Sequence, residues 1–215
     1  MYTIEKIISL FPHLNSEQKK SIEELERLYS YWNERVNLIS RKDMQHFYNR
    51  HVLHSLSIGL YFNLNHHSVL DVGTGGGFPG VPLAILFPNA QFTLVDSIGK
   101  KLNVVNAVAD ELDLKNIITK RSRIEDLKGK YDFLTGRAVK SLPQIMSWSE
   151  HLVNWNRGKE NSGMLYLKGG DFKEELKGLN FDHTLYDLSK TLKDDPFFET
   201  KKLVHLYQTK SNPAF

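Results

Sequence analysis

The chain has 215 residues, of which 40% are hydrophobic and 25% are charged, a balance typical of one folded domain with a real core. It contains no cysteine, which excludes a disulfide framework, a thiolate zinc site and a cysteine nucleophile. Its formal net charge of +3 is compatible with an RNA partner but does not require one.

Residues 1–67 are predicted to form a mostly helical extension packed on the rest of the chain. Ser16 can cap a helix, and apolar residues then recur at helical spacing as far as residue 39. A second helical stretch is expected over residues 44–62. The chain shows no signal peptide pattern and no run of about 18 apolar residues, so we expect a cytoplasmic protein without a transmembrane helix. The sequence does not set the oligomeric state, and a monomer is the expectation.

Residues 68–215 are predicted to form an α/β core, because short strands alternate with helices as in a sheet covered on both faces. The expected strands are SVLDV, QFTLVD, NIITKRS, YDFLTG, GMLYLKGG, HTLYDLS and KLVHLYQTK. Helices are expected over residues 78–87, 100–114, 141–155 and 172–179, and a polar loop over residues 156–163. The last two strands have no helix between them, so we expect them to pair as a hairpin.

A glycine-rich turn, DVGTGGGFPG, follows the first strand and would bring backbone N–H groups and a helix N-terminus close together. Two cofactor patterns fit it: Gly75, Gly77 and Gly80 match the dinucleotide pattern, and Asp71, Gly73, Gly75 and Gly77 match the S-adenosylmethionine pattern. A carboxylate at Asp71 favours a ligand with a sulfonium and an ammonium over a pyrophosphate. Pro79 also lacks an N–H that a pyrophosphate would use. We therefore favour S-adenosylmethionine.

Five further candidates follow the other strands. Asp96 ends the second strand and could accept both hydroxyls of a ribose, or it could be a plain turn residue. Ile124 and Glu125 follow the third strand, where they would meet an adenine or form part of a helix capping box. Arg137 and Lys168 end the fourth and fifth strands. Each could hold a phosphate, a base or the cofactor carboxylate, or form a surface ion pair.

The chemistry open to a methyltransferase of this sequence is narrow. Methylation of cytosine C5 generally requires a cysteine, and the motif typical of exocyclic amino methylation is replaced by TGRA at the fourth strand. The similar tetrapeptide DPFF, residues 195–198, is interpreted as a turn. His51 and His54 lack an obvious third ligand, so no metal is expected. A target with an available lone pair, such as a purine N7, needs positioning rather than deprotonation.

Taken together, the motifs resemble the bacterial 16S rRNA guanine-N7 methyltransferases, the RsmG or GidB family, over nearly the whole chain. In the family's order they are WNERVNLIS, RHVLHS, LDVGTGGGFPGVPLAI, LVDSIGKK, SRIED, GRAVKSL and LYLKGG. The resemblance implies a Rossmann-like class I methyltransferase sheet of seven strands, S-adenosylmethionine as donor and a guanosine of small-subunit rRNA as target. It implies cofactor contacts at Gly73, Phe78, Ile124, Glu125 and Arg137. The family often has an acidic residue where this chain has His54, so a role of that carboxylate does not carry over.

The RNA, free or in the small ribosomal subunit, is expected to cross the carboxyl edge of the sheet and touch the N-terminal helices. Candidate contacts are Arg50, His51, Arg137 and Lys168, with Lys100 and Lys101 at the rim. We expect direct transfer to N7 without a catalytic base, since the N7 lone pair is available at neutral pH. His51 and His54 are the nearby residues that could contradict this expectation by acting as a base. Two alternatives stay open: an oxidoreductase that uses an NAD-type dinucleotide, and a non-catalytic RNA-binding factor in ribosome assembly.

Overall fold

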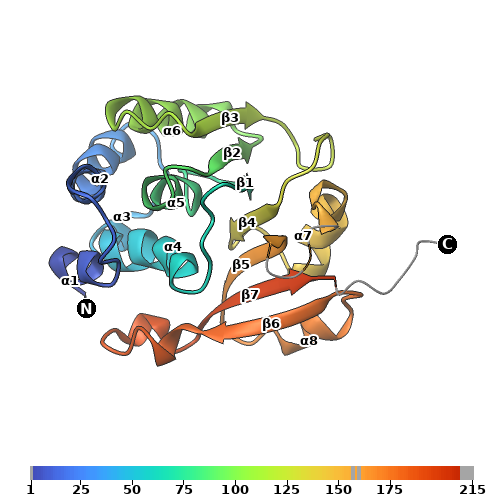
Figure 1. Ribbon diagram of the computed structural model, residues 1–215. Coiled ribbons are helices and arrows are strands. Elements are labelled where there is room, and N and C mark those ends of the chain that lie inside the picture. The colour runs from blue at the N-terminus through green and yellow to red at the C-terminus, as the bar shows by residue number, and fades with distance from the viewer. Residues whose placement is uncertain (1, 156–157, 159–160, 209–215) are drawn as a thin grey trace.

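A single seven-stranded sheet forms the centre of the computed structural model, which describes residues 2–155, 158 and 161–208 (Figure 1). The strand order is β3-β2-β1-β4-β5-β7-β6. The strands are β1 (Ser68–Val72), β2 (Gln91–Asp96), β3 (Ile117–Arg121), β4 (Phe133–Arg137), β5 (Gly163–Gly169), β6 (Asp182–Asp187) and β7 (Lys201–Tyr207). The first five are parallel, whereas β7 runs antiparallel to both β5 and β6. The predicted pairing of the last two strands is confirmed, and it makes the sheet mixed.

Helices cover both faces of this sheet. Successive residues of a strand point to opposite sides, so one strand can contribute to the core on both faces. Val69 of β1 belongs to a cluster with α5 (Gly80–Leu86) and α6 (Gly99–Glu111). Its neighbour Leu70 belongs to a second cluster with α7 (Leu142–Ser149), and the short helix α8 (Lys173–Lys177) follows β5 on the same side. The predicted layered α/β architecture is therefore confirmed.

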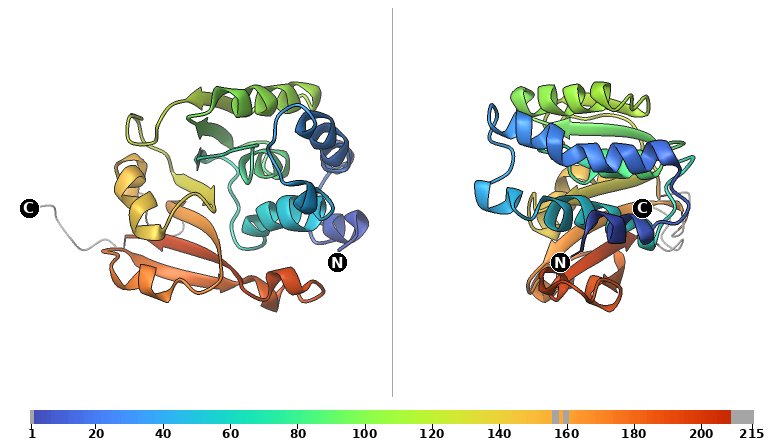
Figure 2. Two further views of the ribbon diagram at one scale, coloured as in Figure 1. Left: turned by 180° about the vertical axis from the view of Figure 1, so that it is seen from behind. Right: turned by 90° about the vertical axis from the view of Figure 1, so that its left-hand side faces the viewer.

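The N-terminal helices join the first of these two clusters. They are α1 (Ile4–Ser9), α2 (Ser16–Asn33), α3 (Arg41–Met44), a π-helix (Tyr48–Leu53), α4 (His54–Leu56) and a 3-10 helix (Ser57–Leu60). Leu25 and Leu53 are fully buried in the same cluster as Val69 of the sheet. The right-hand view of Figure 2 shows α2 lying alongside α6. No helix among the described residues is long and apolar enough to cross a membrane.

Helix α2 differs from its predicted form at both ends. Its N-cap is Asn15 and not Ser16, because the Asn15 side chain accepts the Gln18 N–H at 2.9 Å and the Gln18 side chain accepts the Asn15 N–H at 3.0 Å. It ends at Asn33 and not at residue 39. The Asn33 carboxamide oxygen accepts the N–H groups of Leu38 and Ile39, both at 2.9 Å, and so turns the chain back. A polar side chain bonding to nearby backbone competes with the helix, and here it ends one.

Other predicted elements also change in detail. A π-helix interrupts the helix expected over residues 44–62, and the helix expected over 141–155 ends at Ser149 and continues as a 3-10 helix. Residues 122–130 form no helix, so the capping-box interpretation of that segment is wrong. The DPFF tetrapeptide forms a 3-10 helix, Pro196–Phe198. Parts of the predicted polar loop (156–157 and 159–160) and the predicted end of the last strand (209–210) lie outside the described residues.

Candidate functional site

A cavity of about 520 Å³ opens at the carboxyl ends of β1, β2 and β4, beside the glycine-rich turn. The strand order reverses here, since β1 lies between β2 and β4, and open α/β sheets bind ligands at such points. The cavity is lined by most of the residues predicted from the sequence, namely Gly73, Gly75, Asp96, Ile124, Glu125 and Arg137. Residues from four separate loops thus meet at one place. Asp71, Phe78 and Lys168 do not line it.

The glycine-rich turn follows a path that only glycine adopts readily. Gly75 and Gly77 have φ of 58° and 95°, in the left-handed region that disfavours a side chain. A Cβ at Gly75 would meet no atom within 4 Å, so this position faces open space. A Cβ at Gly77 would lie 2.7 Å from Val81 and 2.9 Å from the hydroxyl of Tyr29. The turn is therefore open on the cavity side and tightly packed behind.

Asp71 supports the turn from beneath. Its side chain is fully buried and accepts hydrogen bonds from the Thr74 hydroxyl at 2.5 Å, the Gly80 N–H at 3.0 Å and the Thr135 hydroxyl at 3.2 Å. Burial raises the pKa of this carboxyl to about 6, against the lowering effect of those hydrogen bonds. The Asp71 side chain is fully buried and does not line the cavity, which argues against the predicted direct contact with a cofactor.

The position of Asp71 also bears on the choice of cofactor. Gly80 is the first residue of α5, and its N–H donates to the Asp71 carboxylate. Dinucleotide-binding folds place the pyrophosphate at this helix N-terminus. A buried carboxylate in that place would repel a second anion, so the turn does not suit a dinucleotide.

Asp96 ties the turn to β2 from the cavity side. One carboxylate oxygen accepts the Gly75 N–H at 2.9 Å, and the other accepts the Ile98 N–H at 2.8 Å. Asp96 therefore fits both predicted interpretations, a turn residue and a ribose contact, since it shapes its own turn and also lines the cavity. Each carboxylate oxygen has a second lone pair, which can accept a hydroxyl of a bound ribose.

Arg137 is fixed by the N-terminal helices. Its Nη1 donates to the backbone oxygen of Arg50 at 2.8 Å, and its Nη2 lies 3.0 Å from Nδ1 of His51. The guanidinium also lies over the ring of Phe78, 5.4 Å from its centroid. Burial lowers the pKa of Arg137 to about 10, which leaves the group charged at neutral pH. Phe78 thus contacts the arginine rather than the cavity.

The two histidines of the RHVLHS motif are unsuited to act as bases. A guanidinium only donates, so Nδ1 of His51 accepts from Arg137 and its proton sits on Nε2, which is buried. Burial, and then the charge of Arg137, lowers the pKa of His51 to about 3. The same causes lower the pKa of His54 well below its usual range. Within the described residues no three His, Cys, Asp or Glu side chains form a possible metal site.

All four predicted RNA contacts, Arg137 included, have partners within the protein. The half-buried ring of His51 is held by Arg137, which argues against a direct contact with RNA. Lys168 ends β5 as predicted, but its ammonium lies 2.8 Å and 2.9 Å from the two carboxylate oxygens of Glu175. Arg50 forms an ion pair with Asp43 at 2.8 Å and remains partly exposed. The ion pair that the sequence left open for both Arg137 and Lys168 is found at Lys168.

Several residues of the site were missed in the sequence. Val139 and Trp148 line the cavity, and the hydroxyl of Tyr29 donates to the backbone oxygen of Gly76 at 2.6 Å. Tyr29 and Trp148 lie on helices whose apolar spacing resembles that of any packed helix, so no local signal marks them.

Known proteins resemble the chain over nearly its full length. A sequence model of the family described as rRNA small subunit methyltransferase G, GidB, matches residues 18–195. A ribosomal RNA small subunit methyltransferase G of Flavobacterium johnsoniae is 48% identical over 205 residues, which are 94% of this chain and 97% of that protein. A protein of the same name from Cytophaga hutchinsonii is 45% identical over 217 residues and 100% of both chains.

Solved structures share the fold at low sequence identity. A ribosomal protein L11 methylase of Lactobacillus delbrueckii subsp. bulgaricus superposes with a TM-score of 0.55 at 15% identity, covering 73% of this chain and 78% of that one. A precorrin-6y C5,15-methyltransferase of Geobacter metallireducens has a TM-score of 0.52 at 9% identity, covering 81% and 92%. These likenesses show that the chain shares the fold of both proteins.

Proposed function

The chain belongs to the rRNA small subunit methyltransferase G family, and we propose that its cavity binds S-adenosylmethionine and guides methyl transfer to guanine N7 of 16S rRNA. It is an rRNA methyltransferase by its family membership. The assignment of the site rests on one observation. Residues from four loops meet around one cavity at the point where the strand order reverses. We place the activity in the cytoplasm, where the ribosomal substrate is made.

The residues around the cavity suit the parts of this donor. Gly75 leaves open space beside the turn, and Asp96 offers free lone pairs for ribose hydroxyls. Ile124 and Glu125 line the same cavity. Ile124 can form an apolar wall beside an adenine, and Glu125 can accept a hydrogen bond from it. When bound, S-adenosylmethionine supplies a methyl group on a positively charged sulfur.

Arg137 is proposed to orient the reacting groups. Two of its N–H groups are used by Arg50 and His51, which leaves others to bind the donor carboxylate or the target base. The lone pair of guanine N7 is available at neutral pH, so no residue has to remove a proton. The low pKa of His51 and the burial of His54 support this mechanism, because neither histidine can take up a proton at that pH. The protein contributes position and electrostatic guidance.

The RNA is proposed to approach the carboxyl edge of the sheet. Lys101 and Arg123 line the cavity there, and Lys100 lies in a neighbouring depression with Arg121. Arg50 is a further candidate, because its side chain remains partly exposed beside Asp43. Phosphate contacts by such residues would make binding depend on salt, with a slope of about 0.7 per neutralised charge on single-stranded RNA.

Purified protein, tritiated S-adenosylmethionine and small-subunit RNA test this function directly. We expect label in 7-methylguanosine and none in RNA that carries 7-deazaguanosine at the target. In cells lacking the protein, that modification should be absent from 16S rRNA. Binding of NAD but not of S-adenosylmethionine would favour the oxidoreductase, and RNA binding without any transfer would favour the assembly factor.

The absence of a catalytic base is tested by pH. Single-turnover rates at saturating substrates should be nearly flat from about pH 6 to 8, where an ordinary histidine titrates. A steep rise in that range, lost on replacement of His51 or His54, would show that a base is required.

A further inference from the structure

The loop between β4 and α7 forms part of the cavity wall and has a strained backbone. Ala138 follows Arg137 directly and has φ of 53°, in a region that residues with a side chain rarely adopt. Val139 then packs on the glycine turn, so that a Cβ at Gly73 would lie 3.0 Å from its methyl carbons. A strained segment keeps its shape only when its surroundings hold it. The hydrogen bonds around this loop identify what does so.

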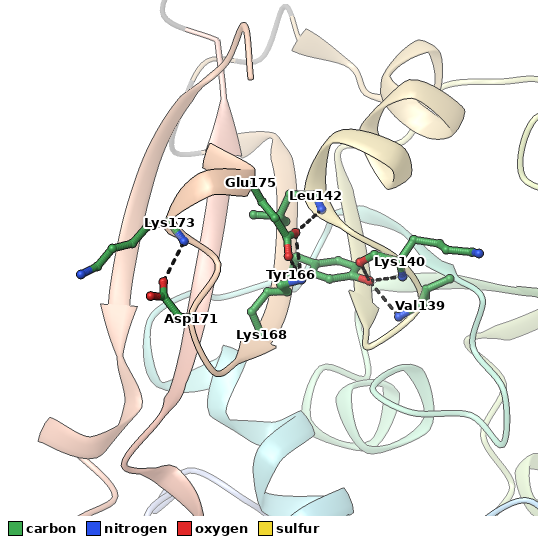
Figure 3. A network of polar contacts seen from close by, with 8 residues as sticks. All are labelled: Val139, Lys140, Leu142, Tyr166, Lys168, Asp171, Lys173 and Glu175. Atoms are coloured by element: carbon green, nitrogen blue, oxygen red, sulfur yellow. Dashed lines mark hydrogen bonds and ion pairs between the residues drawn. The ribbon is translucent and has the colours of Figure 1, made fainter. Parts of the chain in front are cut away.

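Tyr166 of β5 holds the middle of the loop (Figure 3). Its hydroxyl accepts the N–H groups of Val139 at 2.8 Å and Lys140 at 3.1 Å, and it donates to the backbone oxygen of Lys140 at 3.1 Å. A hydroxyl has one proton and two lone pairs, so all of its capacity is used on this loop. Burial raises the pKa of Tyr166, which keeps the donated proton in place.

Glu175 holds the end of the loop, where α7 begins. Its Oε2 accepts the Leu142 N–H at 2.7 Å, whereas the residue at the N-cap, Ser141, forms no capping hydrogen bond through its side chain. A carboxylate is favourable at a helix N-terminus. The ammonium of Lys168 bonds to both oxygens of that carboxylate, as Figure 3 shows. Burial alone would raise the pKa of Glu175, but Lys168 and Leu142 lower it overall.

We infer that Tyr166 and Glu175 are positioning residues that hold Arg137 and Val139 in place for methyl transfer, and that Lys168 acts only through Glu175. This inference rests on the proposed function, because it requires the cavity to hold the donor. It assigns Lys168 a place in the protein's own network instead of on the RNA. Neither Tyr166, Glu175 nor Lys168 lines the cavity, so none would touch the donor.

Tyr166→Phe tests the first part, because it removes the hydroxyl and keeps the ring. We expect single-turnover methyl transfer at saturating substrates to fall on the order of ten- to hundred-fold, since small displacements at a reaction site have effects of this size. Tyr48→Phe is the matched control, because it removes a phenol hydrogen bond to the Glu23 backbone oxygen at 2.7 Å elsewhere. Both variants are assayed well below their melting temperatures. Full activity of folded Tyr166→Phe would overturn the inference.

Glu175 and Lys168 are tested together. Glu175→Gln keeps an acceptor for Leu142 but loses the ion pair, so its rate should lie between those of the wild type and Glu175→Ala. As a single substitution, Lys168→Met should slow transfer, but it should have no further effect in the Glu175→Gln background. The RNA affinity of Lys168→Met should show the same salt dependence as that of the wild type. An additive loss with a slope reduced by about 0.7 would place Lys168 on the RNA instead.

These results separate the inference from the function on which it rests. A wild-type protein that transfers no methyl group to RNA would contradict the proposed function. An active wild type with unaffected variants would contradict only the positioning role.

Discussion

Two hollows lie at opposite ends of the strands, and the larger one is not the proposed site. A groove of about 810 Å³ runs between α2 and α6, whereas the cavity at the glycine turn measures about 520 Å³. In the groove, charged side chains neutralise one another at the surface, as Arg27 does with Glu24 at 2.6 Å and Glu111 at 3.5 Å. In the cavity, Asp96 and Arg137 are each fixed by backbone groups and remain open to a ligand. Fixed polar groups that converge identify a site better than volume does.

The largest expected effect comes from Arg137. Replacement by Ala should lower single-turnover methyl transfer on the order of hundred-fold or more, because it removes a cation that two hydrogen bonds fix in the cavity wall. Arg27→Ala, in the groove, is the matched control and should leave the rate unchanged. Equal losses in the two variants would remove the distinction between cavity and groove.

Asp71 should make stability depend on pH. Its pKa in the folded chain, about 6, lies above the ordinary value of 3.8, so the folded chain holds this proton more tightly between those values. The contribution of Asp71 to the free energy of unfolding is then largest below pH 4. It falls as the pH rises to 6 and is constant above that, and the total change is up to about 3 kcal/mol.

Chemical denaturation of the wild type and Asp71→Asn from pH 4 to 7 measures this change. The wild type should lose stability relative to the variant as pH rises, while the other carboxyl groups cancel in the difference. A relative gain for the wild type would mean that the three hydrogen bonds outweigh burial and that the ionised form is the favoured one.

Asp96 should control affinity for the donor. Asp96→Ala removes a charge-assisted hydrogen bond, typically worth about 1.5–3 kcal/mol, so calorimetry should record a ten- to hundred-fold weaker binding of S-adenosylmethionine. Asp113→Ala in the groove provides the comparison and should bind normally. Unchanged affinity in Asp96→Ala would exclude the ribose assignment.

The smallest expected effect concerns His51, which we interpret as a support for Arg137. Asn can place an acceptor oxygen near the position of Nδ1, so His51→Asn should cost only a few-fold in rate, and His51→Leu clearly more, because the bond to Arg137 is then lost. Donor affinity and single-turnover rate, measured for both variants, would separate positioning from binding. Equal rates in the two variants would show that the bond to Arg137 has no part in catalysis.

Local patterns in the sequence were enough to predict the strands, the glycine turn and most residues of the cavity. Each of these depends on spacing within one strand and the loop that follows it, as for Asp96 after β2. The misplaced residues depend on distant partners. Asp71 bonds to Thr135, 64 positions away, and Arg137 meets His51 from the π-helix. A pattern within one segment carries no information about such pairs, and the predicted division of the chain after residue 67 stays a prediction.

The close approach of Tyr166 to Gly136 links the evolution of two neighbouring strands. A Cβ at Gly136 would lie 2.9 Å from the Tyr166 ring and 3.0 Å from a methyl carbon of Val72, so this chain can hold the tyrosine there only beside a glycine. A serine at position 136 should therefore clash with the ring. A smaller residue at position 166 would relieve that contact but lose the hydrogen bonds from the Tyr166 hydroxyl to the loop. Neither change is free of cost alone, and the measured activity of Gly136→Ser, alone and with Tyr166→Leu, would reveal the coupling between the two positions as epistasis.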